Sequence, residues 1–215
     1  MDKPIENLRT GVASSLPVKS SAESAVEQMF AAGFEVLPAM PHDAAISPAS
    51  NITSGGKVPG RLLPDGTWVG FRGWTKFRIM RRHVRTWGKW PDAGVCIRTG
   101  SVVGIDIDVT DETLSLEIEQ LALDICGSAP CRIGNPPKRL LPYRSTEPRR
   151  KVKVDFIHRD TGEIHAVEIL GTGQQFVADG IHPKTKKPYT WECGNLIELG
   201  FNGLTEVTPG KVDQF

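Results

Sequence analysis

Two aspartates interrupt an apolar run formed by Ile105, Asp106, Ile107, Asp108 and Val109. Successive side chains of a β-strand point to opposite faces, so Asp106 and Asp108 would share one face and the apolar residues the other. Two neighbouring carboxylates repel each other at neutral pH unless a positive charge lies between them. Mg²⁺ and Mn²⁺, hard cations that prefer oxygen ligands, supply such a charge. The pattern therefore predicts a metal-binding pair on a strand.

Short acidic pairs are common by chance in a chain with 25 acidic residues, so the apolar setting of this pair is what singles it out. A third acid, Glu168, lies in a similar apolar run at 166–170. Three carboxylates on neighbouring strands would suit two metal ions of the kind used in phosphoryl and nucleotidyl transfer. One ion lowers the pKa of the attacking hydroxyl, and the other neutralises the leaving pyrophosphate.

A triphosphate also needs basic side chains, and Arg132, Lys138 and Arg139 precede or occupy a predicted strand. His182 lies beside a turn and a lysine cluster, where it is either a phosphate contact or an exposed turn histidine. The glycine-rich segment 171–175 is interpreted as a tight turn, with a phosphate-cradling loop as the alternative.

The chain around these residues alternates strand and helix signals. β-branched runs predict strands at 94–98 and 102–109, and Pro, Gly and Ser predict a long loop at 40–67. Helical spacing of apolar residues predicts three helices. The first begins at a Ser20–Glu23 capping box, the second spans about 75–88, and the third runs from Thr110 or Asp111 to Gly127. Further strands are expected at 34–38, 130–133, 138–144, 151–157, 163–170, 174–179 and 189–192. This order predicts an α+β fold with helices on one face of a sheet.

Charge is unevenly distributed, although the net charge of the 215 residues is only +1. Residues 66–91 hold seven basic side chains and no acid, and residues 125–154 hold eight basic side chains and one acid. Each segment therefore carries +7, and the rest of the chain carries −13. This segregation predicts a surface for a phosphate-bearing partner, with a merely solvated face as the alternative.

Several motifs together resemble the N-terminal primase–polymerase domain of bifunctional replication proteins of phages, plasmids and prophages, within the archaeo-eukaryotic primase superfamily. The matching segments are 33–39, 56–60, 94–100, 103–109, 132–141, 167–183 and 188–191. The resemblance implies an RRM-like antiparallel or mixed sheet as the catalytic core, with an N-terminal α/β unit. It implies template-directed nucleotide addition for phage, plasmid or prophage DNA replication, in the cytoplasm of a bacterium or a phage-infected host.

The same resemblance assigns roles to residues. Asp106, Asp108 and Glu168 match the first and third family motifs, which hold two Mg²⁺ or Mn²⁺ ions. The second motif normally carries a histidine, which the segment 138–144 lacks. Lys138 or Arg139 would replace it, with help from Arg132. The basic side chains expected to contact template phosphates are Arg78, Arg81, Arg82, Arg85, Arg149, Arg150 and Lys151.

These observations predict a flexible tail at 1–19, a catalytic domain at 20–200 and a linker-like segment at 201–215. The resemblance implies a longer protein in which a helicase module follows this segment, with a small stand-alone protein as the alternative. The partners expected are a DNA template and primer, dNTPs and in some reactions NTPs. No apolar run approaches the length of a membrane span, and no paired cysteine motif suggests a zinc site or disulfide framework. Three other functions remain open: a nuclease, a nucleotide-sugar transferase and a catalytically silent DNA-binding module.

Overall fold

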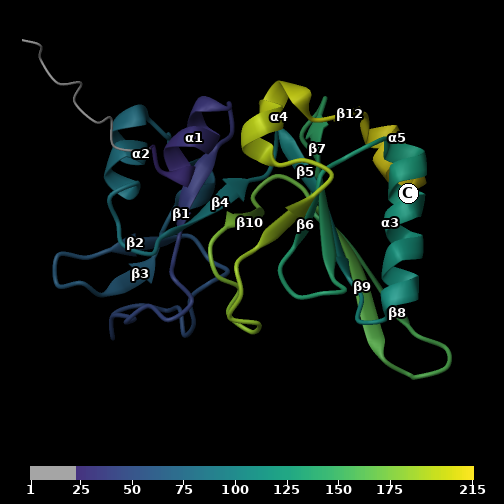
Figure 1. The fold of residues 1–215 in the computed structure, drawn as a ribbon, viewed down its shortest axis with the longest axis horizontal. Coiled ribbons are helices and arrows are strands. Elements are labelled where there is room, and N and C mark those ends of the chain that lie inside the picture. Colours follow the sequence, from purple (N-terminus) through teal and green to yellow (C-terminus); the bar gives the residue numbers. More distant parts are fainter. Residues whose placement is uncertain (1–22) are drawn as a thin grey trace, which may run out of the picture.

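The structure, a computed structural model, describes residues 23–215 (Figure 1). The predicted tail at 1–19 and residue Ser20 of the predicted capping box lie outside the described residues. The first helix, α1 (Ala25–Ala31), begins after Ser24, whose backbone N–H and hydroxyl donate to the Glu27 carboxylate at 3.2 and 2.8 Å. The capping box is therefore formed by Ser24 and Glu27 rather than by the pair four residues earlier.

The N-terminal part of the chain forms a small α/β unit on the left in Figure 1. Its three-stranded antiparallel sheet has the order β1-β4-β10, with a separate β2–β3 hairpin beside it. Its elements are α1, β1 (Val36–Ala39), β2 (Gly60–Leu62), β3 (Trp68–Gly70), the 3-10 turn η1 (Trp74–Lys76), α2 (Arg81–Trp87), β4 (Gly94–Arg98) and β10 (Gln175–Asp179). The hairpin strand β2 falls within the segment 40–67 that was predicted to be loop.

The helix predicted at 75–88 is shorter than expected. Residues 77–80 lie between η1 and α2 and are not helical. The Arg98 guanidinium donates to the carbonyl oxygens of Trp74 and Phe77, both at 2.9 Å, and these contacts stabilise the non-helical turn. A long-range contact therefore overrides the local helical pattern.

The second unit contains the larger sheet, with strand order β11-β6-β7-β5-β9-β8 and β12 paired with β7. All neighbours are antiparallel except β12, which runs parallel to β7. Its elements are β5 (Val102–Asp108), α3 (Glu112–Cys126), β6 (Cys131–Ile133), β7 (Arg139–Ser145), β8 (Val152–Ile157), β9 (Ile164–Leu170), β11 (Thr190–Glu192), α4 (Leu196–Gly203), β12 (Glu206–Val207) and α5 (Pro209–Gln214). The predicted α+β class is confirmed.

Helices cover one face of this larger sheet. Ile105 and Ile107 of β5 are fully buried in the core that also contains Ala122 of α3 and Val212 of α5. The opposite face joins the N-terminal unit, because Leu140 of β7 belongs to the core of that unit. The two units therefore meet on the face of β5 that carries the aspartates.

The C-terminal segment differs from its linker-like interpretation. Residues 201–215 contain the end of α4, then β12 and α5, and Val207 and Val212 are 0% and 4% exposed. Val207, Val212 and Phe215 pack in the core of the larger sheet and α3, and Phe201 and Leu204 pack in the other core, so the segment is part of the fold. Among residues 23–215, none of the helices combines the length and the apolar character that crossing a bilayer requires.

Candidate functional site

The strand register places the predicted acids on one face of the larger sheet. Asp106 of β5 lies directly opposite Glu168 of β9, and Asp108 shares the face of Asp106 because it lies two residues further along β5. Directly opposite residues of antiparallel strands have Cβ atoms about 4.5–5.5 Å apart. On its other side Asp106 lies opposite Leu140 of β7, and Leu140 lies opposite Arg132 of β6. Alternation along four strands thus brings three acids and one arginine together.

Each of these carboxylates faces a basic side chain. Arg132 Nη2 lies 3.7 Å from Asp106 Oδ1, and Lys151 Nζ lies 2.6 Å from Glu168 Oε2. Lys138 Nζ forms an ion pair with Asp108. Positive charge therefore already offsets the repulsion between the carboxylates that the sequence pattern implied.

Asp106 is the central carboxylate of the three, opposite Glu168 and two residues from Asp108. Loss of water at the pocket floor raises the pKa of its carboxyl, and the neighbouring Asp108 and Glu168 raise it further. Arg132 and Lys57 act in the opposite direction, because a cation favours the ionised carboxylate. The site is thus built so that additional positive charge would stabilise ionised Asp106.

Arg132 is fixed at the pocket floor by several contacts. Its guanidinium donates to the Val177 carbonyl at 3.0 Å and lies 4.9 Å from the centroid of the Tyr189 ring. Only 13% of its side chain is exposed. Gly134 makes room for this ring, since a Cβ atom there would lie 2.3 Å from Tyr189 Cε1. Arg132 is therefore a preorganised positive charge beside Asp106.

His182 is a buried residue of the pocket wall, 3% exposed, rather than an exposed turn histidine. Its Nδ1 accepts the backbone N–H groups of Lys184 and Thr185, both at 3.3 Å. This bonding assigns the proton of the neutral ring to Nε2, which is then a donor. Burial, together with the cations Lys57, Arg132, Lys138 and Lys184, lowers the pKa of His182 to about 4.

These groups line one pocket of about 350 Å³ between the two units. The predicted residues that it brings together are Asp106, Asp108, Glu168, Arg132, Lys138 and His182. Lys57, Lys184, Gln174, Gln175 and Tyr189 also line it. Four basic side chains and three carboxylates therefore surround a cavity of the size that holds small ligands. Such a mixture can bind a phosphate chain while it holds acids close to the reacting atoms.

Arg139 is not part of this pocket. It pairs with Ile107 in the register and so projects to the opposite face, where its Nη1 lies 3.1 Å from Glu119 and 3.3 Å from Glu192. Of the two residues, Lys138 is therefore the one that lines the pocket. The pocket-facing residue of β7 opposite Asp106 is Leu140, and the imidazole in the pocket comes instead from His182.

The residues predicted to contact DNA are not gathered at one place. Arg149 is 12% exposed and pairs with Asp213 of α5 at 2.6 Å, whereas Arg150 is exposed. Lys151 pairs with Glu168. The remaining four are exposed and form no ion pair with another described residue: Arg78, Arg81, Arg82 and Arg85. Arg149 thus stabilises the C-terminal helix, and the α2 residues remain available as a surface.

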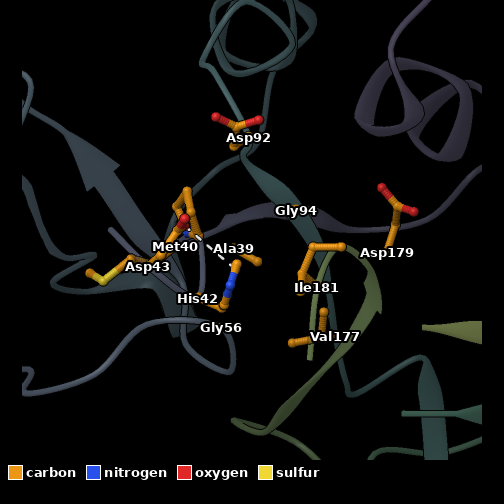
Figure 2. Close-up of a pocket in the computed structure, with 12 residues that line it drawn as sticks. Ala39, Met40, His42, Asp43, Gly56, Asp92, Gly94, Val177, Asp179 and Ile181 are labelled. Carbon is orange, nitrogen blue, oxygen red and sulfur yellow. Dashed lines mark ion pairs between the residues drawn. The ribbon is translucent and has the colours of Figure 1, made fainter. Parts of the chain in front are cut away.

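A smaller cavity of about 210 Å³ adjoins the site, with Val177 lining both (Figure 2). Its wall carries Asp43, Asp92 and Asp179 but no lysine or arginine. Burial raises the pKa of Asp179, which marks it as a poor place for a further negative charge. The basic side chains thus lie on one side of Val177 and the acidic ones on the other.

Lys57 is the main pocket residue that local sequence patterns do not indicate. It lies in the long segment rich in Gly, Pro and Ser, and partial desolvation lowers its pKa while Asp106 raises it. Only the packing of this segment against β10 brings it close, since the Gln175 side chain donates to the Lys57 carbonyl at 2.7 Å. Its place in the 56–60 motif of the family resemblance was the one signal that could have indicated it.

Comparison with known proteins adds one finding to this geometry. The model of the Prim-Pol family, described as "Bifunctional DNA primase/polymerase, N-terminal", matches residues 26–207. The matched range contains every residue of the pocket. No curated protein matches the chain.

Proposed function

Because the chain belongs to the family of bifunctional DNA primase/polymerase N-terminal domains, we propose that it catalyses template-directed addition of nucleotides to DNA. The observation that carries this proposal is the face shared by Asp106, Asp108 and Glu168, surrounded by cations that suit a triphosphate. In the reaction, the primer 3′-hydroxyl oxygen bonds to the α-phosphorus of the incoming nucleotide. The bond from that phosphorus to the bridging oxygen breaks, and pyrophosphate leaves.

The donor set is compatible with Mg²⁺ or Mn²⁺. Among residues 23–215, no three His, Cys, Asp or Glu side chains converge closely enough to hold an ion by themselves. Mg²⁺ usually binds through one or two carboxylates together with substrate phosphates and water, so Asp106 and Asp108 are sufficient when a nucleotide is present. The raised pKa of Asp106 supports this assignment, because a cation would favour the ionised form.

We therefore assign Asp106, Asp108 and Glu168 as the ligands of two divalent cations. Bound ions would lower the pKa of the 3′-hydroxyl and neutralise charge on the leaving pyrophosphate. To bind them, the carboxylates would release Lys138 and Lys151, whose ammonium groups then become free to contact phosphates. These two ion pairs would then be replaced by contacts with the substrate.

The chain's own cations would orient the triphosphate. Arg132 is held rigidly and presents its guanidinium beside Asp106. Neutral His182 would donate its Nε2–H to a phosphate oxygen, while Lys57 and Lys184 add charge at the pocket wall. These contacts would place the α-phosphorus near the acids.

Primer extension tests the proposal. Primed and unprimed DNA templates are incubated with dNTPs or NTPs and with Mg²⁺ or Mn²⁺, and the products are sized. We expect the primer to lengthen with dNTPs, and products from the unprimed template would show synthesis without a primer. Shortening of the primer would indicate a nuclease and overturn the proposal. The replication of a phage, plasmid or prophage, and a helicase module in the same protein, stay predictions of the resemblance.

The rival of a silent DNA-binding module requires a second measurement. Asp106→Ala/Asp108→Ala should abolish extension and leave binding of the primed template intact. An unaltered extension rate in this variant would show that the metal site lies elsewhere. If the wild-type protein binds DNA but extends no primer under any of these conditions, the silent module is the correct function.

A further inference from the structure

A larger hollow of about 550 Å³ lies beside the active site on the N-terminal unit. It is formed by the β2–β3 hairpin, the segment 49–52 and the turn from Phe71 to Trp74, and we call it the hairpin groove. Gln175 lines both the hairpin groove and the active-site pocket. The two hollows are therefore neighbours that share one side chain as a wall.

The hairpin groove combines positive charge with apolar and aromatic surface. Its lining contains Arg61 and Arg72 but no aspartate or glutamate. Both arginines are exposed, and within the described part of the chain neither forms an ion pair. The Arg61 guanidinium lies 5.8 Å from the centroid of the Phe71 ring, and Trp74 is partly exposed. Grooves that bind single-stranded nucleic acids use the same combination, in which cations follow the backbone and aromatic rings stack on bases.

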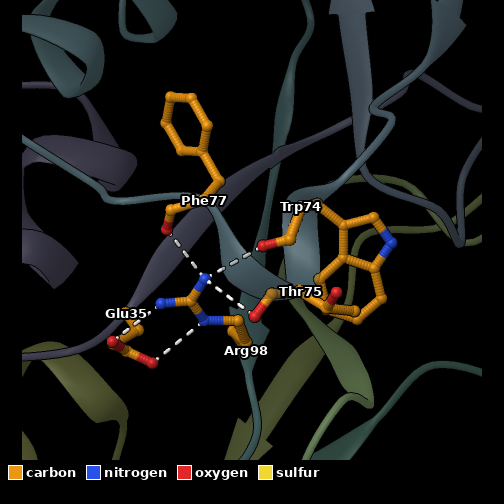
Figure 3. Close-up of polar contacts among 5 residues, drawn as sticks. All are labelled: Glu35, Trp74, Thr75, Phe77 and Arg98. Atoms are coloured by element: carbon orange, nitrogen blue, oxygen red, sulfur yellow. Dashed lines mark hydrogen bonds and ion pairs between the residues drawn. The ribbon is translucent and has the colours of Figure 1, made fainter.

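The turn that carries Trp74 is held in place from below by Arg98 (Figure 3). One guanidinium nitrogen donates to the carbonyl oxygens of Trp74 and Phe77, both at 2.9 Å. The other two nitrogens donate to the Glu35 carboxylate at 3.0 and 2.8 Å. Arg98 is therefore a positioning residue that fixes Trp74 before any ligand binds, and such preorganisation reduces the entropy lost on binding.

The hairpin groove is also connected to the active-site pocket through neighbouring residues. Gln175 lies directly opposite Arg98 in the β4–β10 register, and its amide donates to the Lys57 carbonyl at 2.7 Å. Lys57 in turn lines the active-site pocket. Trp74 is thus bonded to Arg98, Arg98 lies opposite Gln175, and Gln175 is bonded to Lys57, so neighbouring residues connect the two hollows.

We propose that the hairpin groove binds the unpaired template strand next to the nucleotide that is being copied. Trp74 stacks on a template base there, and Arg61 and Arg72 contact the adjoining phosphates. An unpaired strand is the occupant because its base faces are free to stack, whereas those of a duplex are covered by neighbouring base pairs. The proposal rests on the proposed function, since it is polymerase activity that places a single-stranded template beside the active site.

Binding of fluorescent single-stranded DNA, measured by anisotropy, tests the groove directly. Arg61→Ala/Arg72→Ala removes two exposed charges, and Arg159→Ala/Lys211→Ala is the matched control because it removes two exposed charges elsewhere. We expect the groove variant to lower the salt dependence, the slope of log K against log salt, by about 1.4, since each phosphate contact to a single strand contributes about 0.7. The control should keep the wild-type affinity and slope. Equal effects of both variants would overturn the proposal.

Trp74 provides a second readout that does not depend on charge. Trp74→Ala should weaken binding about tenfold, while Trp74→Phe keeps a stacking surface and should bind within about threefold of wild type. Thermal unfolding of each variant shows whether the turn remains folded. A template with bromodeoxyuridine beyond the copied position should cross-link on irradiation to Trp74 in the wild-type protein. Cross-links to α2 alone would show that the strand follows the exposed arginines there and would refute the groove.

The same variants distinguish failure of this inference from failure of the proposed function. If the groove binds the template, Arg61→Ala/Arg72→Ala raises the KM for template and leaves the extension rate at saturating template close to wild type. If that variant extends the primer with an unchanged KM for template, the proposed polymerase activity stands and template binding in the hairpin groove is excluded. If the template cross-links to Trp74 but the wild-type protein never extends a primer, strand binding in the hairpin groove stands and polymerase activity is excluded.

Discussion

Arg132 shows how single side chains of this pocket are fixed before a substrate arrives. It contacts the Val177 carbonyl, the Tyr189 ring and Asp106 at the same time. Arginine suits this position because its planar guanidinium can stack on a ring and donate hydrogen bonds in its own plane. The positive charge of the pocket floor therefore has a defined location, which electrostatic stabilisation of a developing anion requires.

The close packing around Gly134 gives the first residue-scale prediction. In Gly134→Ala the new methyl group would lie 2.3 Å from the Tyr189 ring, so the ring and the stacked Arg132 must move. We expect a loss of about 1–3 kcal/mol in the free energy of unfolding, typical of overpacking. Nucleotide affinity should fall at the same time, and fluorescence titration with a dNTP measures it. A variant with wild-type stability and affinity would contradict the described packing.

The buried imidazole gives a prediction about pH. The folded pKa of His182 is lowered to about 4 from an ordinary value of 6.5, so the unfolded chain takes up a proton first as the pH falls. Stability should therefore be fully present above about pH 6.5 and decline between pH 6.5 and 4. In His182→Asn, whose side-chain oxygen can accept the same backbone N–H groups, this decline should be smaller by about 2–3 kcal/mol.

Chemical denaturation of both proteins at pH 7 and pH 4.5 measures this difference. Parallel losses in His182→Asn and wild type would show that His182 is not buried in its neutral form.

At the scale of the element, Arg98 decides the conformation of the chain between η1 and α2. The Arg98 side chain is 12% exposed, and its guanidinium bonds both to Glu35 and to the turn carbonyls. Arg98→Ala removes the guanidinium donor from Glu35 and from the Trp74 and Phe77 carbonyls, and should lower the free energy of unfolding by about 2–3 kcal/mol. Arg98→Lys should not restore the loss, because an ammonium group cannot reproduce the planar fork. Rescue by lysine would contradict this role.

The C-terminal elements give a matched pair of packing predictions. Val207→Ala and Val212→Ala each remove a buried side chain from the core under α3 and should lower stability by about 2 kcal/mol. Val154→Ala, at a position 57% exposed on β8, should change stability by less than about 0.5 kcal/mol. Thermal or chemical denaturation compares the three variants. If all three variants change the free energy of unfolding by equally small amounts, the linker interpretation of residues 201–215 would be supported instead.

Local sequence patterns predicted most elements of the larger sheet, because alternation and turn residues are local signals. Helix α3 lies between the expected residues Asp111 and Gly127, and in the smaller sheet the strand at 94–98 has the expected bounds. The register that pairs Asp106 with Glu168 depends on contacts distant in sequence and could not be predicted. The same limit explains Arg139, since its face is set only when β7 aligns with β5.

Over the whole molecule, the site forms where the two units meet. The larger sheet supplies the acids and Arg132, while β10 and the loops that carry Lys57 and His182 supply the opposite wall. The net charge of +1 conceals this organisation, because a pocket with four cations lies beside a cavity that carries only acids and His42 as ionisable groups. The electrostatic field of the molecule therefore attracts phosphate groups to the basic pocket and repels them from the acidic cavity.

Incorporation of a single nucleotide into a primed template, compared between wild type and Asp106→Asn/Asp108→Asn, tests the central claim most directly. The substitutions keep the shape of the side chains and remove the charges that would bind divalent cations. We predict that the incorporation rate falls by about 10³-fold or more, while the affinity for primed DNA stays the same or increases. A double variant that incorporates the nucleotide at the wild-type rate would contradict the account.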